Sequence, residues 1–195
     1  MTTENSYKIV VSVGTDHHLF DRLIDWVDHW MEKQDEAPSC FVQHGASRTP
    51  KYGTAKDRLP REDLLDIYRG AELVVVQGGP GSILDAREIG AVPLAVPRAP
   101  WLKEVVDGHQ IEFTKVMAKH GNAHFVDNED LLHQMMDRVL ANPEQYRTAP
   151  RVADPQAAGF LLSGAIDTMH AEKSRGLRKI LRRTTQLLPV PGRHR

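Results

Sequence analysis

The chain has 195 residues, of which 41% are hydrophobic and 26% charged, and its formal net charge is −1. These values predict one domain with a sizeable core and a short appendage. They exclude a membrane span, since no run approaches the roughly 20 apolar residues that a span needs. Cys40, the only cysteine, excludes an internal disulfide and is expected to be a buried structural thiol.

Short apolar runs with β-branched residues predict the strands of the chain. The run at 73–77 is unbroken, which is typical of a strand buried on both faces of a parallel sheet. The segment 52–58 is a weaker strand prediction. In chain order, the predicted strands are residues 7–13, 39–43, 52–58, 73–77, 92–96 and 123–126.

Apolar residues at helical spacing predict helices between these strands. The first should be capped by Thr15 or Asp16, and its residues Asp25 and Asp28 should form a solvated face. Asn128 or Asp127 should cap the last. The further helices are expected at residues 60–70, 81–90, 107–120 and 128–142. This alternation predicts an α/β fold, a doubly wound, Rossmann-like parallel sheet of about six strands over residues 1–149, followed by a tail at 150–195.

The most informative segment is the glycine turn after the strand at 73–77. It reads Gln77-Gly78-Gly79-Pro80-Gly81-Ser82, and Asp85 follows one turn later. A strand, a glycine turn and a helix N-terminus together present backbone N–H groups to a phosphate or diphosphate. The spacing matches neither a phosphate-binding loop with Lys-Ser/Thr nor G-x-G-x-x-G, which argues against an ATPase and a dinucleotide oxidoreductase.

Three segments carry a more specific resemblance: residues 74–89, Pro93 to Arg98, and Glu104 to Gln110. Together with the opening 11–24, they resemble glycosyltransferase family 28, C-terminal half. The similarity covers about residues 7–141. It is closest in pattern to the stand-alone donor-binding subunits of two-component enzymes of the dolichol pathway and of bacterial exopolysaccharide synthesis.

The resemblance implies that a UDP-sugar is the substrate, with no cofactor and no metal. Asp85 takes the position of a Glu that binds the ribose, residues 79–82 border the diphosphate, and Asp107 and Gln110 hold the sugar from one helix face. His109 is a weaker candidate. The expected nucleotide-sugar-binding residues are Gly14, Thr15, Gln77, Gly78, Gly79, Pro80, Gly81, Ser82, Asp85, Arg98, Asp107, His109 and Gln110.

The activity implied is inverting transfer of a hexosyl unit to a lipid-linked or polysaccharide acceptor. A membrane-anchored partner subunit is expected to bind the acceptor and to supply the general base. Gln77 and Val105 stand where relatives often have His, so the alternative is a degenerate module that scaffolds or regulates a partner glycosyltransferase. A nucleotide-sugar epimerase would need two such halves. His17 and His18 are expected to be surface residues rather than diphosphate ligands.

The tail is basic, with eight Lys or Arg and no acid after Glu172, which leaves about −9 on residues 1–172. Residues 174–188 have the pattern of a basic amphipathic helix. Two interpretations stay open, contact with an anionic membrane surface and docking on the domain itself, whereas nucleic acid is disfavoured by the acidic body. The polar N-terminus predicts a cytoplasmic location, with recruitment to the inner face of the plasma membrane through this tail.

Overall fold

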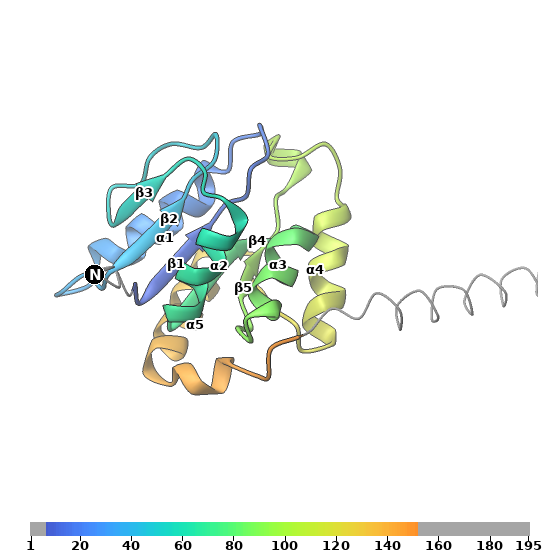
Figure 1. Ribbon diagram of the computed structural model, residues 1–195. Helices are drawn as coiled ribbons and strands as arrows, with labels where there is room; N and C mark the ends of the chain where they lie inside the picture. Colours follow the sequence, from blue (N-terminus) through green and yellow to red (C-terminus); the bar gives the residue numbers. More distant parts are fainter. Residues whose placement is uncertain (1–6, 152–195) are drawn as a thin grey trace, which may run out of the picture. The chain divides into compact units, whose positions relative to one another are not determined.

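The computed structural model describes residues 7–151, and in this part of the chain six strands form one parallel sheet (Figure 1). The strand order is β3-β2-β1-β4-β5-β6, which confirms the predicted doubly wound α/β fold. The weakly predicted strand at 52–58 exists as β3. The strands are β1 Ile9–Ser12, β2 Cys40–Gln43, β3 Thr54–Lys56, β4 Leu73–Gln77, β5 Leu94–Val96 and β6 His124–Phe125.

Four α-helices connect these strands and a fifth follows β6, and each predicted helix between residues 7 and 151 is present with its ends shifted by a few residues. Asn128 caps the last helix as expected, since its Oδ1 accepts a hydrogen bond of 2.9 Å from the Leu131 N–H. The helices are α1 Asp21–Glu32, α2 Arg61–Gly70, α3 Pro80–Glu88, α4 His109–Lys119 and α5 Glu129–Ala141. Two 3₁₀ turns, η1 Pro100–Leu102 and η2 Pro143–Tyr146, complete the described elements.

The central strands are buried on both faces of the sheet, and successive residues of each strand point into different cores. In β1, Ile9 and Val11 pack in the core that includes α1 and α5. Val10 packs instead with residues of α2 and α3 in the second core. Complete burial of each such side chain contributes about 2 kcal/mol. This explains why the buried strands read as continuous apolar runs.

The predicted cap of the first helix is wrong. Helix α1 begins after Phe20 and has no side-chain cap. Asp16 instead accepts a 2.9 Å hydrogen bond from the His18 N–H, within the connection that precedes the helix. An Asp side chain that bonds the backbone two residues further on forms a tight turn, so Asp16 is used locally.

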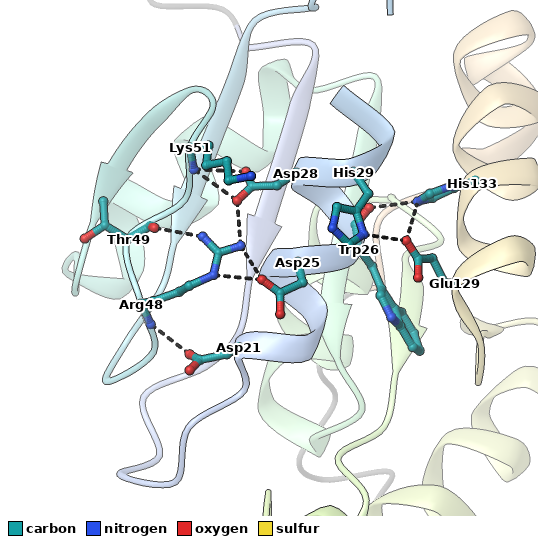
Figure 2. Close-up of polar contacts among 10 residues, drawn as sticks. All are labelled: Asp21, Asp25, Trp26, Asp28, His29, Arg48, Thr49, Lys51, Glu129 and His133. Atoms are coloured by element: carbon teal, nitrogen blue, oxygen red, sulfur yellow. Dashed lines mark hydrogen bonds and ion pairs between the residues drawn. The ribbon is translucent and has the colours of Figure 1, made fainter. Parts of the chain in front are cut away.

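The predicted solvated face of α1 is also wrong at Asp28, which is only 1% exposed. Figure 2 shows its carboxylate beside Arg48, with the Nη2–Oδ2 distance at 2.7 Å. The Lys51 N–H donates to the same carboxylate at 3.0 Å. Asp25 Oδ1 accepts a second bond from the Arg48 guanidinium. Helical spacing placed these acids on the polar face of α1. It gave no sign that this face is covered, because the arginine that covers it comes from the loop after β2.

The strand order reverses between β1 and β4, and neighbouring connections diverge there, leaving a crevice at the carboxyl ends of the strands. The glycine turn follows β4 directly and therefore lies at this crevice. Cys40, at the start of β2, is buried as predicted. No helix within residues 7–151 is long and apolar enough to cross a bilayer. The basic amphipathic helix predicted at 174–188 lies outside the described residues.

Candidate functional site

A cavity of about 310 Å³ lies at the carboxyl ends of β1, β2 and β4. It brings together residues from three separate connections of the sheet, as a switch-point site requires. Of the residues expected from the sequence, the cavity is lined by Gly14, Thr15, Gln77, Gly81, Ser82 and Asp85. The lining also includes polar residues that were not expected from the sequence, among them Gln43, Arg58, Arg61 and Tyr68.

The amide of Gln77 lies between two glycine turns. A Cβ added to Gly14 would meet the amide nitrogen at 3.0 Å, and one added to Gly79 would approach it more closely than real contacts allow. Gly14 also has a φ of +83°, which favours glycine. These two glycines therefore leave room for the side chain of Gln77.

Gln77 is only partly satisfied. Its Nε2 donates a hydrogen bond of 3.3 Å to the Ser82 hydroxyl, whereas its Oε1 is buried and has no hydrogen-bond partner among residues 7–151. Turning the amide would exchange the two atoms and still leave one of them unpaired. A buried polar atom without a partner is costly, and here it lies at the wall of an open cavity. A hydroxyl of a bound ligand could donate to this oxygen, and in the turned amide the unpaired nitrogen could donate to a phosphate oxygen.

Helix α3 begins at the cavity with no side-chain cap. Pro80 is its first residue and has no N–H, so the backbone donors of the turn are those of Gly79, Gly81 and Ser82 rather than of every residue in 79–82. A Cβ on Gly81 would meet nothing within 4 Å. The protein itself gives no packing reason for this glycine, which lines the cavity.

Gly78 has a different role from its neighbours. A Cβ there would collide with the side chain of Thr114 and the backbone of Pro97. The Thr114 hydroxyl lies 3.1 Å from the Gly78 carbonyl oxygen. Gly78 therefore allows α4 to pack closely against the turn, and does not line the cavity.

Asp85 lines the cavity with one of its oxygens already engaged. Its Oδ1 lies 2.9 Å from Arg61 Nε and 2.8 Å from Arg61 Nη2. Arg61 also pairs with Glu88, and these two acids, Glu88 first, raise the pKa of the guanidinium. Arg61 therefore orients the carboxylate expected to bind the ribose.

Arg98 is 1% exposed and does not reach the cavity. Its guanidinium donates to the carbonyl oxygens of His18 at 2.7 Å, Val13 at 2.9 Å and Glu104 at 3.0 Å. It therefore holds the connection after β1 against the connection after β5. Burial lowers the pKa of Arg98, and Asp16 and Glu104 oppose that effect.

Asp107 and Gln110 do not share a helix face, since α4 begins only at His109. Asp107 is exposed, accepts the His109 N–H at 3.0 Å and lies 2.7 Å from His109 Nδ1. These bonds, the backbone one first, lower the pKa of Asp107. Gln110 Oε1 accepts the Arg98 N–H at 3.3 Å. Polar residues of the loop thus bond locally instead of continuing the helix.

A second, apolar hollow of about 450 Å³ holds His109, Gln110 and Pro80, together with Phe113 and Val116 of α4. Pro80 and Gly81 are consecutive, so the two hollows meet at the first turn of α3. Most of the expected site residues therefore line either a polar cavity or an apolar hollow. Four of them line neither: Gly78, Gly79, Arg98 and Asp107.

The missed residues Arg58 and Arg61 flank the Leu59-Pro60 step between β3 and α2. Both arginines could have been expected from the sequence, because the connection after the predicted strand at 52–58 also lies at the carboxyl edge of the sheet. Gln43 ends β2, with its Oε1 accepting the Leu59 N–H at 3.0 Å, and thereby fixes the connection beside the cavity.

A Rossmann-like domain with an uncapped glycine turn at its switch point belongs to the class of nucleotide-binding α/β domains. Comparison with known proteins narrows this class. Residues 8–160 match the glycosyltransferase family 28 C-terminal domain, and the chain belongs to this family.

A relative in Azoarcus sp. (strain BH72), a UDP-N-acetylglucosamine–N-acetylmuramyl-(pentapeptide) pyrophosphoryl-undecaprenol N-acetylglucosamine transferase, is 27% identical over 81 residues. The match covers 42% of this chain and 22% of that protein.

Two solved structures share the fold. The glycotransferase of kitacinnamycin gives a TM-score of 0.53 at 16% identity, over 74% of this chain and 38% of the other. Acinetobacter baumannii MurG gives a TM-score of 0.51 at 18% identity, and the match covers 73% of this chain and 43% of that protein. The chain thus matches less than half the length of each of these proteins.

Proposed function

We propose that the cavity binds the nucleotide part of a UDP-sugar and that the domain is the donor-binding part of an inverting glycosyltransferase. The observation that carries the proposal is the unpaired Gln77 Oε1 beside the free N–H groups of Gly79, Gly81 and Ser82. Such a mixture of donors and one acceptor suits a diphosphate flanked by sugar hydroxyls. Family membership and the acetylglucosamine transferase relative support the same substrate class.

In this mechanism an acceptor hydroxyl attacks the anomeric carbon of the donor sugar, and the bond from that carbon to the diphosphate breaks. Negative charge grows on the leaving diphosphate. The N–H groups of the turn and the positive end of α3 lie where that charge develops, and they are fixed before the reaction. The transfer of a hexosyl unit therefore needs no metal in this proposal.

Asp85 is the residue proposed to bind the ribose hydroxyls. It lines the cavity, its side chain is 23% exposed, and Arg61 holds its Oδ1. In this arrangement the diphosphate lies at the N-terminus of α3, and the ribose lies one helical turn further along, at Asp85. Gln110 and the apolar hollow beyond Pro80 are proposed to take the sugar end.

The acceptor, lipid-linked or polysaccharide, is proposed to be bound by a membrane-anchored partner subunit. An exposed apolar surface that suits a partner is present on the connection after β5, where Trp101 is 73% and Val106 is 83% exposed. Contact of residues 174–188 with an anionic leaflet remains part of the proposal, and those residues lie outside the described structure.

Calorimetry with UDP and a panel of UDP-sugars tests the proposal. Asp85→Ala should abolish most of the heat of binding. Glu88→Ala is the matched control, because Glu88 also pairs with Arg61 but does not line the cavity. If the wild-type chain, alone and with its partner, ignores every UDP-sugar, donor binding is refuted and the scaffold alternative gains support.

A further inference from the structure

The connection after β1 carries Asp16, His17 and His18, which the proposed function leaves unused. Both histidines lie close to the same carboxylate oxygen of Asp16. Its Oδ1 accepts the His18 N–H at 2.9 Å, lies 2.7 Å from the ring Nδ1 of His18, and lies 3.3 Å from Nδ1 of His17. Two consecutive histidines are thus turned toward one carboxylate.

His18 is held in place through both its backbone and its side chain. Its carbonyl oxygen accepts a 2.7 Å hydrogen bond from the buried guanidinium of Arg98. The His17 and His18 rings lie 4.0 Å apart between centroids. With Asp16 bonded at Nδ1, the ring is fixed in both position and orientation. Catalytic groups need this kind of support from their neighbours.

The other ring nitrogen of His18 is free. Within residues 7–151, no hydrogen bond engages Nε2, and the side chain is 26% exposed. A carboxylate at Nδ1 favours the tautomer that carries its proton on Nδ1 and a lone pair on Nε2. His18 therefore carries a lone pair on a nitrogen without a protein partner in this part of the chain, and its ring is oriented by an acid, as in hydrolases that use a histidine base.

Asp16 borders the proposed donor site. Thr15 and Arg58 line the main cavity, and both also line an adjoining hollow of about 280 Å³ together with Asp16 and His17. A Cβ on Gly14, immediately before them, would meet the Gln77 amide at 3.0 Å. Asp16 thus lies at a hollow that adjoins the end of the cavity where the diphosphate is proposed to bind, and it bonds His18, which itself lines neither hollow.

We propose that His18 is the general base of the transfer reaction and that Asp16 is its positioning residue, an inference that rests on the proposed function. His18 Nε2 takes the proton of the acceptor hydroxyl as that oxygen bonds to the anomeric carbon. The bond from the carbon to the diphosphate oxygen breaks, UDP leaves with the electron pair, and the imidazolium later gives its proton to solvent. The base is then on this chain, and not on a partner.

The charges around His18 suit this role. The His18 N–H, and then its ring, lower the pKa of Asp16, so the carboxylate is ionised and stabilises the imidazolium that forms. The other titratable or charged groups near the pair are His17, the Arg98 guanidinium and, in the hollow that Asp16 lines, Asp57 and Arg58. Asp16 lies nearest of these to the ring nitrogen.

A divalent ion is the competing use of these residues, since the ligand atoms of Asp16, His17 and His18 all lie within 4.8 Å of one another. The direct distance of 2.7 Å between His18 Nδ1 and Asp16 Oδ1 is that of a hydrogen bond. A ligating nitrogen would instead direct its lone pair at the ion. The geometry therefore favours the base, and the metal becomes an outcome of the test.

The test is UDP release from a UDP-sugar that binds in calorimetry, with water as the acceptor and the full-length chain as the enzyme. His18→Asn keeps an N–H near the position of Nδ1 but has no basic nitrogen. It should lower kcat about 100-fold with the donor Kd unchanged, since general bases contribute at least that factor. Asp16→Asn should give a smaller loss.

The matched control is His29→Asn. His29 Nδ1 also pairs with a carboxylate, Glu129 Oε1 at 2.8 Å, on α1 and α5 away from the cavity (Figure 2). This variant should keep the wild-type rate. A merely structural role of His18 would leave the pH profile of the residual rate unchanged, whereas loss of a base removes its rise with pH, and added imidazole should restore part of the rate.

Each outcome distinguishes this inference from the proposed function. If no UDP-sugar binds the wild-type chain, donor binding itself fails. If donors bind and His18→Asn keeps both rate and pH profile, the base assignment is wrong. Activity that EDTA abolishes and Zn²⁺ restores, with Zn²⁺ binding lost in His18→Asn, would show a metal site instead. Nitrogen NMR of His18 gives a readout independent of turnover, and a proton on Nε2 in place of Nδ1 overturns the proposal.

Discussion

Arg61 Nε lies 2.9 Å from Asp85 Oδ1 and so joins the start of α2 to α3 at the mouth of the cavity. The same guanidinium pairs with Glu88, one turn further along α3. Asp85 is one methylene shorter than the Glu that the family resemblance implies at this position. In the proposed donor site, Arg61 fixes the direction of the shorter side chain and so reduces the freedom that is lost on binding a ribose.

Replacing Arg61 should weaken UDP-sugar binding without abolishing it. The side chain is 49% exposed, and exposed ion pairs are worth about 0.2–1 kcal/mol, so Arg61→Ala should raise the donor Kd about twofold to fivefold. Calorimetry at two salt concentrations measures the change, and Glu88→Ala serves as control. Tighter binding by Arg61→Ala would show that the arginine competes with the ribose for Asp85.

Two glycines of the same turn should respond differently to alanine. A Cβ on Gly81 meets nothing, and alanine is favoured in a helix by about 1 kcal/mol, so Gly81→Ala should fold at least as stably as wild type. It should nevertheless bind UDP-sugars more weakly, because the methyl group enters the cavity. Thermal unfolding and calorimetry on the same sample separate the effects.

Gly79→Ala should lose stability as well, because its Cβ collides with the Gln77 amide. Overpacking of this kind costs about 1–3 kcal/mol. Gly79→Ala combined with Gln77→Ala removes the colliding amide, and most of the stability should return. An unchanged unfolding temperature for Gly79→Ala alone would refute the packing described between these residues.

The sheet, its strand order and the glycine turn could be predicted because each depends on local patterns along the chain. The run at 73–77 and the turn after it are contiguous, and parallel strands bring their carboxyl ends to one edge. The contact of Arg61 with Asp85 and the burial of Asp28 could not be read in this way. Both depend on a side chain from another connection, Arg61 reaching Asp85 and Arg48 reaching Asp28.

The helix predicted at 107–120 begins two residues later than expected, and Asp107 lies outside it for a related reason. Apolar periodicity places a helix but not its first residue, and the bond from the His109 N–H to Asp107 sets that boundary. The expected pairing of Asp107 with Gln110 on one face depended on that first turn. Asp107 is instead exposed and bonds to its neighbour.

Burial of Cys40 should make the stability fall at high pH. Burial, and secondarily the charge of Asp28, raise the pKa of the thiol from its usual 9.0 to about 12. The folded pKa is the higher one, so this contribution is complete below pH 9 and is lost as the pH rises toward 12. By pH 10 the unfolded thiol is mostly ionised, and the loss is about 1 kcal/mol.

Urea unfolding at pH 8 and pH 10 measures this loss. Cys40→Ala is the control, because it removes the ionisation and should show a decline smaller by that amount. The native thiol should also resist alkylation at pH 8, where thiolate is the reactive form. Equal declines in both proteins would contradict the burial of Cys40.

Asp28 and Arg48 should stabilise the domain more than any surface pair of α1. Asp28 is buried and accepts bonds from Arg48 and from the Lys51 N–H, so Asp28→Ala leaves a backbone donor and a guanidinium without that partner (Figure 2). Breaking a buried pair costs about 3–5 kcal/mol, and the exposure of Arg48 and its remaining bond to Asp25 reduce the expected loss to about 2 kcal/mol. Glu129→Ala, which removes the exposed pair with His29, should cost no more than about 1 kcal/mol. Chemical unfolding of both variants gives the comparison. Equal losses of unfolding free energy in the two variants would mean that the Asp28–Arg48 pair does not hold the loop after β2. The position of β3 and of Arg58 beside the cavity would then not depend on Asp28.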